Sequence, residues 1–323
     1  MQKKQKILVG MSGGVDSSVT AALLLDAGHD VTGAFMVNFD EHDKHGLPCY
    51  THEYRDALRV AAKLGIRLLK IDFTKEYKEK VLEYMYSEYK AGRTPNPDVL
   101  CNKYIKFGAW LDRARELGFD MLATGHYARK GHEDGLHRLF AAKDDAKYQT
   151  YFLHQLNQEQ LACAMFPLGD YTKQEVRALA SKFDLPNAEK EESMGICFVG
   201  EVPMKEFLQK NIAPVPGDVV LSESSRSVGP VDPSLGIEGG TTAQPQKIGS
   251  HEGLAFYTIG QRHGFEQKGA DKPLFVVEKR FDTNELVVGY EDDPKLHSVQ
   301  SDITKPHWIS GQAPSFPLKC EVR

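Results

Sequence analysis

The sequence predicts an α/β fold built on a doubly wound parallel sheet. Three observations support this fold class. Strand-like and helix-like segments alternate regularly from residue 6 to about residue 125. Each strand candidate is a short apolar run, whereas each helix candidate is longer and mixes apolar with polar residues. The chain has 323 residues, 41% of them hydrophobic, which is enough for about two or three domains with buried cores. In such sheets ligands bind at the carboxyl ends of the strands.

The alternating half begins with an apolar strand at residues 6–11 and a helix at 17–27 that stops before Gly28. Further strands are predicted at residues 30–36, 67–73 and 120–125, and helices at 52–64, 75–90 and 103–117. Thr172 is the predicted N-cap of one more helix at 173–183, because Pro186 lies just beyond its end.

Beyond residue 212 the helical periodicity fades, and short β-rich runs take its place. Strands are predicted at residues 218–221, 254–259, 273–279 and 286–290, with a hairpin connection at 281–285. The stretch 222–250 is rich in Ser, Gly and Pro, which predicts a flexible surface loop.

Composition excludes several classes of protein. The net charge of −5 argues against a generally basic nucleic-acid binder, so any RNA contact must be local. No apolar run approaches the roughly 20 residues of a membrane span, and the first residues lack the apolar core of a signal peptide. The five cysteines include no C-x-x-C pair, which argues against a disulfide framework and a zinc site. We therefore expect free thiols, no bound metal and a cytoplasmic location without membrane contact.

The loop between the first strand and the first helix has the composition of an anion site. Its glycines allow the backbone to approach a phosphate closely, and its serine hydroxyls add donors at a helix N-terminus. It lacks the Gly-Lys-Ser/Thr ending of the mononucleotide P-loop. It matches instead the Ser-Gly-Gly-x-Asp-Ser signature of ATP pyrophosphatases, which cleave ATP between the α and β phosphates. An ordinary glycine turn in an α/β domain is the alternative.

A second unusual segment surrounds Cys101. Pro95 and Pro97 impose an extended backbone and exclude helix until after Pro97. Asp98 is then the predicted N-cap, which leaves Cys101 in the first helical turn, where a thiol becomes more nucleophilic. The alternative is that Cys101 is a small buried hydrophobic residue.

The remaining cysteines give weaker signals. Cys197 stands between two glycines and resembles a buried strand residue, and its distance from Cys101 is not set by the sequence. Cys49, Cys163 and Cys320 match no motif, and we expect them to be structural.

Five segments together resemble the tRNA-specific 2-thiouridylase family, which makes 2-thiouridine at the wobble position of certain tRNAs. The segments are Ser-Gly-Gly-Val-Asp-Ser-Ser, Gly-Arg-Thr-Pro-Asn-Pro-Asp-Val-Leu-Cys-Asn, Ala-Thr-Gly-His-Tyr-Ala, Gly-Ile-Cys-Phe and His-Glu-Gly-Leu…Tyr-Thr-Ile-Gly-Gln-Arg. They occur in this order over nearly the whole chain. The Asn-Pro-Asp-x-x-Cys and Gly-Ile-Cys elements are more specific than the ATP loop.

The resemblance implies a role for each matching position. Met36 and Gly125 would line the nucleotide site, and Asn96, Pro97 and Asp98 would contact the target base. Eight consecutive residues would hold the ATP phosphates: Gly10, Met11, Ser12, Gly13, Gly14, Val15, Asp16 and Ser17. Four others would contact tRNA: His126, Lys147, Tyr148 and Gln149.

The resemblance also implies the reaction. ATP would adenylate the C2 oxygen of uridine, with Mg²⁺ neutralising the phosphates. Cys197 would carry a persulfide from a sulfur-relay donor protein, and its terminal sulfur would displace AMP. Cys101 would be the nucleophile that cleaves the S–S bond and leaves a disulfide with Cys197, while Asp98 acts as general base or orients the uridine. The enzyme would work as a monomer.

The resemblance further implies an adenine nucleotide alpha hydrolase-like fold in three domains. These are an ATP-pyrophosphatase catalytic domain at 1–200, a central tRNA-binding or linking domain at 201–270, and an incomplete β-barrel at 271–323. The barrel is expected to be incomplete because the chain stops at Arg323, where the family continues. Tyr148 replaces the Asp usual in the family, and it could stack on a base.

Two alternative functions follow from the same residues. A non-catalytic tRNA-binding protein is the first, because the barrel is expected to be short. An ATP-pyrophosphatase ligase or amidotransferase for a small molecule, with incidental cysteines, is the second.

Overall fold

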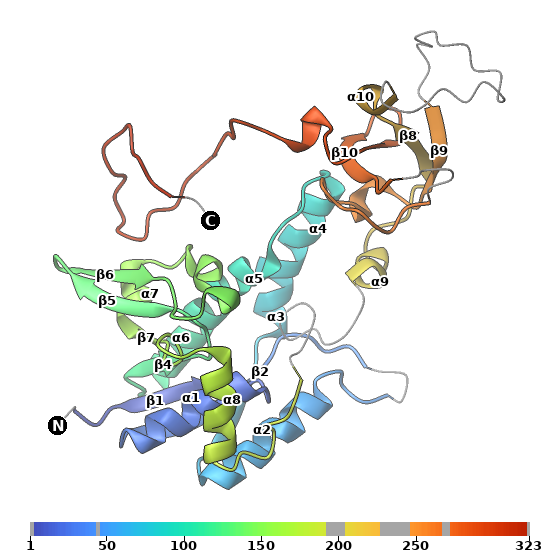
Figure 1. The fold of residues 1–323 in the computed structure, drawn as a ribbon. Helices are drawn as coiled ribbons and strands as arrows, with labels where there is room; N and C mark the ends of the chain where they lie inside the picture. Colours follow the sequence, from blue (N-terminus) through green and yellow to red (C-terminus); the bar gives the residue numbers. More distant parts are fainter. Residues whose placement is uncertain (1–2, 43–45, 192–203, 227–245, 267–271, 322–323) are drawn as a thin grey trace. The chain divides into compact units, whose positions relative to one another are not determined.

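The structure is a computed structural model, and it describes residues 3–42, 46–191, 204–226, 246–266 and 272–321 (Figure 1). The chain divides into two compact units. Unit 1 comprises residues 1–84, 96–202 and 305–323, and unit 2 comprises residues 85–95 and 203–304. Within the described residues, no helix combines the length and apolar character that crossing a membrane requires.

A five-stranded sheet forms the centre of unit 1. Its strands are β1 (Lys6–Gly10), β2 (Asp30–Val37), β3 (Leu68–Asp72), β4 (Met121–Ala123) and β7 (Ala164–Met165). Their order is β3-β2-β1-β4-β7, and every neighbouring pair is parallel. The predicted parallel α/β sheet is confirmed, since β1 to β4 match the four predicted strands within about two residues.

The order of the strands reverses at β1. The chain goes from β1 outward to β2 and β3 on one side, and β4 pairs on the other side of β1. Such a switch point leaves a crevice outside the carboxyl ends of the two central strands. The loop that follows β1 therefore lies where a doubly wound sheet binds its ligand.

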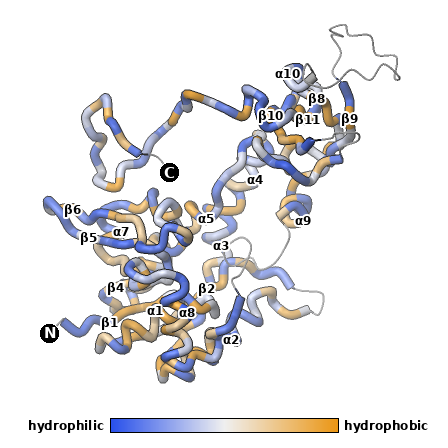
Figure 2. The backbone as a smooth tube through the Cα atoms, in the orientation of Figure 1, coloured by the Kyte–Doolittle hydropathy of each residue, from blue (hydrophilic) through white to orange (hydrophobic). Residues whose placement is uncertain are grey.

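The apolar residues of β1 and of helix α1 (Val15–Asp26) form the middle of the unit 1 core. Ile7, Leu8 and Val9 are fully buried, as are Val19 and Ala21 on α1. Figure 2 shows this concentration of hydrophobic residues along β1 and α1. Helices α2 (Thr51–Leu64) and α8 (Lys173–Lys182) add to the same core. Thr172 is the N-cap of α8, as predicted, and it also forms a full capping box with Glu175.

Two helical stretches contain π-helical segments. The first runs through α3 (Thr74–Tyr77), a π segment at Lys78–Leu82 and α4 (Glu83–Lys90). The second runs through α5 (Pro97–Leu100), a π segment at Cys101–Ala109 and α6 (Trp110–Glu116), with a kink at Gly108. The helices predicted at 75–90 and 103–117 are therefore present, but the second begins six residues earlier.

A β-hairpin of unit 1 was not predicted. Strands β5 (Arg129–Glu133) and β6 (Leu136–Phe140) pair antiparallel and are followed by helix α7 (Gln158–Cys163). Asp134 and Gly135 join them with φ of 52° and 75°, as a two-residue type I′ turn requires. The hairpin is largely hydrophilic (Figure 2). Strands were predicted from short apolar runs, and these two strands contain none.

Unit 2 contains a four-stranded sheet in the order β10-β11-β8-β9. The strands are β8 (Gly217–Leu221), β9 (Gln246–His251), β10 (Phe275–Arg280) and β11 (Glu285–Gly289), with short helices α9 (Met204–Gln209) and α10 (Glu223–Arg226). Strands β11 and β8 are parallel, whereas the other two pairs are antiparallel. The sheet joins strands on both sides of residue 270, where the sequence predicts a domain boundary.

The unit 2 predictions had mixed outcomes. The hairpin connection at 281–285 is confirmed by the antiparallel pairing of β10 with β11. The strand predicted at 254–259 is wrong, because Leu254–Phe256 forms a 3₁₀ turn that buries Leu254 and Tyr257 in the core. The loop predicted at 222–250 contains α10 and most of β9, and its residues 227–245 lie outside the described part.

Candidate active site

The loop after β1 leads directly into the N-terminus of α1. Gly14 occupies the N-cap position, and no side chain caps the helix. The first N–H groups of α1 therefore lack an intrahelical acceptor and are available to an anion. Ser17 and Ser18 donate hydroxyl hydrogen bonds of 3.0 and 2.8 Å to the Gly14 carbonyl, which holds the loop in place. This geometry fits the predicted phosphate loop.

Two glycines allow the loop to pack closely. Gly13 has φ of +78°, and a Cβ atom there would lie 2.3 Å from the Glu53 carbonyl oxygen of α2. Gly125 follows β4, and a Cβ atom there would lie 3.0 Å from the backbone of Asp16 and Ser17. The structure thus brings Gly125 against the phosphate loop, although the two are more than a hundred residues apart in sequence.

A cation and a phenol both bind the loop carboxylate. Asp16 Oδ1 accepts a 2.6 Å hydrogen bond from Lys173 Nζ and a 3.0 Å bond from the Tyr127 hydroxyl. Lys173 is the first residue of α8, so the cap at Thr172 sets its position. The pair is less than a third exposed, which strengthens its attraction relative to a surface pair.

Asn187 and Lys190 support the loop from another segment. Asn187 is 7% exposed, and its Nδ2 donates to the Gly13 carbonyl at 2.9 Å and to Ser18 Oγ at 3.0 Å. Lys190 Nζ lies 2.7 Å from Asp56 Oδ2 and 3.5 Å from the Gly13 carbonyl. Sequence reasoning missed Asn187, Lys190 and Lys173. Only the capping box could have pointed to Lys173.

The helix that carries Cys101 starts at Pro97. Asn96 is its N-cap, and the Asn96 side-chain oxygen accepts hydrogen bonds of 3.1 and 3.3 Å from the N–H groups of Asp98 and Val99. The prediction that Asp98 is the N-cap is therefore wrong. Proline is well suited to the first helical position because its φ fits and its missing N–H needs no partner. The helix starts earlier for this reason, and Cys101 lies in its second turn instead of its first.

Cys101 is fully buried at the carboxyl end of β2. Asn38, which follows β2 and is 2% exposed, directs its side-chain nitrogen toward Cys101 Sγ at 3.9 Å. The thiol is thus shielded from solvent in this conformation, which matches the alternative of a buried small residue. Met36, two residues before Asn38, is also buried, and it pairs with Ile71 of β3.

Comparison with known proteins places this site in a family. A family model described as the tRNA methyl transferase HUP domain matches residues 5–201, and one described as the tRNA methyl transferase PRC-barrel domain matches residues 239–290. The tRNA-specific 2-thiouridylase MnmA of Halalkalibacterium halodurans is 43% identical over 99% of this chain and 81% of that protein. The protein of the same name from Exiguobacterium sibiricum is 47% identical over 98% of this chain and 79% of that protein.

The chain belongs to the tRNA-specific 2-thiouridylase family. The resemblance inferred from the five motifs is confirmed, and so is the fold class. Among solved structures, the U34-tRNA thiolase NcsA from Methanococcus maripaludis aligns with a TM-score of 0.37 and 19% identity, over 64% of this chain and 63% of that chain. That structural similarity is too low to add to the assignment.

In this 2-thiouridylase, the segment expected to contact tRNA is connected to the phosphate loop. Gln149 Oε1 accepts a 3.1 Å hydrogen bond from the Tyr127 N–H, and the Tyr127 hydroxyl donates to Asp16. Tyr148 stacks on Tyr151 with ring centroids 6.3 Å apart, and both Lys147 and Tyr148 are half-buried. The structure therefore brings 147–149 and the loop together through Tyr127, which sequence reasoning missed.

His126 of the 2-thiouridylase has an imidazole with a lowered pKa. Burial, together with the nearby positive charge of Lys106, holds the pKa of its imidazole well below the usual value of 6.5. Its Nδ1 shares a 2.7 Å hydrogen bond with the Thr124 hydroxyl. His126 is partly accessible, so a tRNA contact there would use a neutral ring.

The second predicted catalytic cysteine, Cys197, lies outside the described residues, as does the Gly-Ile-Cys motif around it. Within the described part, Cys49, Cys101, Cys163 and Cys320 form no disulfide bond with one another. Within that part, no group of three or more His, Cys, Asp or Glu side chains is arranged to hold a metal ion.

Proposed function

We propose that this protein is an ATP-dependent tRNA sulfurtransferase that converts the wobble uridine of tRNA to 2-thiouridine. One observation carries the proposal: the chain belongs to the 2-thiouridylase family and holds, at one sheet edge, an uncapped phosphate loop and the Asn-Pro-Asp-x-x-Cys helix. Nothing specific favours a non-catalytic tRNA-binding protein or a small-molecule ligase.

The phosphate loop would bind ATP through the free N–H groups of α1, while Met36 and Gly125 line the nucleotide site. Mg²⁺ would neutralise the ATP phosphates, and Asp16 is the carboxylate that the loop itself supplies. The uridine O2 would attack the α-phosphorus and release pyrophosphate, which converts a poor leaving group into AMP.

The target uridine would be held by Asn96, Pro97 and Asp98, and the surrounding tRNA by His126, Lys147, Tyr148 and Gln149. Asn96 uses its side-chain oxygen for the helix cap, which leaves its amide N–H groups for an RNA acceptor. Asp98 is positioned one turn before Cys101 on the same helix, where it would orient the base or accept a proton.

The two cysteines would carry out the sulfur transfer. The terminal sulfur of a Cys197 persulfide, loaded by a sulfur-relay donor protein, would attack C2 and displace AMP. The Cys101 thiolate would attack the inner sulfur, so that the S–S bond of the persulfide breaks as a Cys101–Cys197 disulfide forms, either directly or after release of hydrogen sulfide. A dithiol reductant would restore both thiols. Because Cys101 is fully buried in this structure, the segment around it must open during the cycle.

Mass spectrometry of tRNA nucleosides tests the proposal. The full chain is incubated with tRNA, ATP, Mg²⁺ and a persulfide donor, beside Cys101→Ser and Cys197→Ser variants. We expect 2-thiouridine from the native chain alone. Absence of product from the native chain, when it still binds ATP, would contradict the proposed activity. Product from both serine variants would instead favour a ligase with incidental cysteines.

We also propose that the enzyme acts as a monomer in the cytoplasm. The absence of a membrane-spanning helix among the described residues is compatible with this location. Light scattering of the purified chain would measure its mass in solution. A mass that corresponds to a dimer would contradict the proposed monomer.

A further inference from the structure

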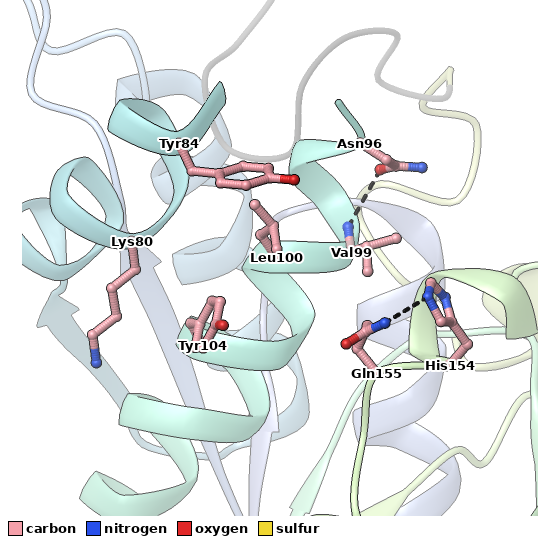
Figure 3. A pocket seen from close by; sticks show the side chains of 8 residues that line it. All are labelled: Lys80, Tyr84, Asn96, Val99, Leu100, Tyr104, His154 and Gln155. Carbon is pink, nitrogen blue, oxygen red and sulfur yellow. Dashed lines mark hydrogen bonds between the residues drawn. The ribbon is translucent and has the colours of Figure 1, made fainter. Parts of the chain in front are cut away.

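Unit 1 contains a groove in which only Asn96 has a role proposed above. We call it the tyrosine groove, and its volume is about 650 Å³. Figure 3 shows side chains from three elements around it: the helix through α3 and α4, the helix that starts at α5, and the turn after residue 153. Its lining residues are Lys80, Tyr84, Asn96, Val99, Leu100, Tyr104, His154 and Gln155.

Two of the exposed residues that line the groove are tyrosines. Tyr84 is 46% exposed and Tyr104 is 37% exposed, although both are large aromatic residues of a folded unit. Leu100 lies one turn before Tyr104 on the same helix and lines the groove with it. Exposed aromatic faces that line a hollow mark a binding site more often than a scattered surface residue does.

Positive charge accompanies the tyrosines. Lys80 lies one turn before Tyr84 and lines the same groove. The Lys103 ammonium lies 5.1 Å from the centre of the Tyr104 ring and 3.1 Å from Gln155 Oε1. Glu76 and Asp112 line the adjoining hollow, so the charge around the groove is mixed. A purely phosphate-binding surface would be uniformly basic, and the aromatic faces therefore point to a base as the principal ligand.

The groove continues from the position proposed for the target uridine. Asn96 lines the groove and also caps the helix that carries Asp98 and Cys101. A nucleotide next to the target would therefore enter the groove as soon as the target reached the Asn96 end of the helix. Single-stranded RNA loops are recognised mainly by stacking of splayed-out bases on aromatic side chains.

We propose that the tyrosine groove binds an unstacked base of the anticodon loop that neighbours the target uridine, with stacking on Tyr84 or Tyr104 and Lys80 and Lys103 near its phosphates. This inference rests on the proposed function, because it takes its ligand from the proposed tRNA substrate. It extends that function by assigning a binding site for a base that is not modified.

The test measures binding of an anticodon stem–loop RNA to the full chain by fluorescence anisotropy. The Tyr84→Ala, Tyr104→Ala double variant removes both rings, and the matched Tyr84→Phe, Tyr104→Phe variant keeps them. Loss of stacking on one base lowers affinity about 5- to 150-fold. We therefore expect the alanine variant to bind the stem–loop RNA about 5- to 150-fold more weakly than the native chain does. The phenylalanine variant is expected to stay within about threefold of the native chain, since a ring face remains for stacking.

A second RNA, which lacks the neighbouring bases, tests whether the groove binds a base. Abasic nucleotides on either side of the target uridine should weaken binding to the native chain but not weaken binding to the alanine variant any further. Equal losses in both proteins would overturn the proposal, because the removed base would then contact something else. ATP affinity within twofold of native for the alanine variant would confirm that it is folded, and the Tyr104→Ala single variant replaces it if the double variant fails to fold.

Other outcomes separate this inference from the proposed function. Native RNA affinity in the alanine variant would overturn the groove assignment while the thiolation proposal stands. The assignment would also be overturned if the alanine variant lost affinity for the persulfide donor protein but bound RNA as tightly as the native chain does. The groove would then bind a protein. Tyrosine-dependent RNA binding by a chain that makes no 2-thiouridine would support the groove and contradict the proposed function.

Discussion

Replacing Gly13 by alanine should damage the phosphate loop far more than an ordinary glycine substitution does. The residue has φ of +78°, which costs a non-glycine residue about 1–2 kcal/mol. The new Cβ would also lie 2.3 Å from the Glu53 carbonyl oxygen, so the backbone of α2 or of the loop must move. Overpacking of this kind costs about 1–3 kcal/mol, and we expect a total of about 2–5 kcal/mol.

Gly28→Ala is the matched control, because Gly28 lies at the other end of the same helix. Its φ is +85°, and nothing lies within 4 Å of the position of a Cβ atom. Only the conformational cost of about 1–2 kcal/mol applies to it. The difference between the two variants therefore isolates the clash with Glu53.

Urea unfolding monitored by tryptophan fluorescence would measure both variants. The two tryptophans, Trp110 and Trp308, belong to unit 1, so the signal reports on the unit that contains the loop. ATP binding is measured alongside, and only Gly13→Ala is expected to weaken it. Equal loss of stability in the two variants, or unchanged ATP affinity in Gly13→Ala, would refute the reasoning.

Three further predictions concern other parts of unit 1. Asn96→Ala should lower the free energy of unfolding by about 1 kcal/mol through loss of the helix cap, whereas Asn96→Ser should restore most of it, as urea unfolding would show. The Lys143 ammonium and the capping box lower the pKa of Glu175 to about 2. The stabilisation that this carboxylate provides is thus complete above its ordinary pKa of 4.5 and is lost as the pH falls toward 2. The difference in free energy of unfolding between the native chain and Glu175→Gln should therefore disappear over that range. A difference that does not change with pH would contradict this prediction. A bulky thiol reagent should modify exposed Cys320 well before buried Cys101, as peptide mass spectrometry after brief labelling would report, and the reverse order would contradict the burial of Cys101.

Much of unit 1 was predictable because its central parallel strands, β1 and β2, are buried on both faces. Such strands are continuous apolar runs, and β1 at residues 6–10 shows this directly. Hairpin β5–β6 failed the same criterion because its residues are largely polar. The Asp134-Gly135 turn was the local signal that could have revealed it.

The site was predictable where its chemistry is local and not where it depends on packing. The loop after β1 could be predicted as a phosphate site from consecutive residues, because a strand, a glycine turn and a helix follow one another in the chain. The contact of Asn187 with Gly13 spans 174 residues and had no sequence signal. The cap at Asn96 was misassigned because two strong cap residues, Asn96 and Asp98, flank Pro97, and the preference of proline for the first helical position decides between them.

Tyr127 connects the loop proposed to bind ATP with the segment proposed to contact tRNA. Its hydroxyl touches the carboxylate of the phosphate loop, its backbone N–H touches Gln149, and its side chain is fully buried. If ATP changes the position of this one residue, RNA affinity changes with it. Thermodynamic reciprocity then requires that RNA change the affinity for ATP by the same factor. A change at this buried residue would then alter the affinities for both substrates together.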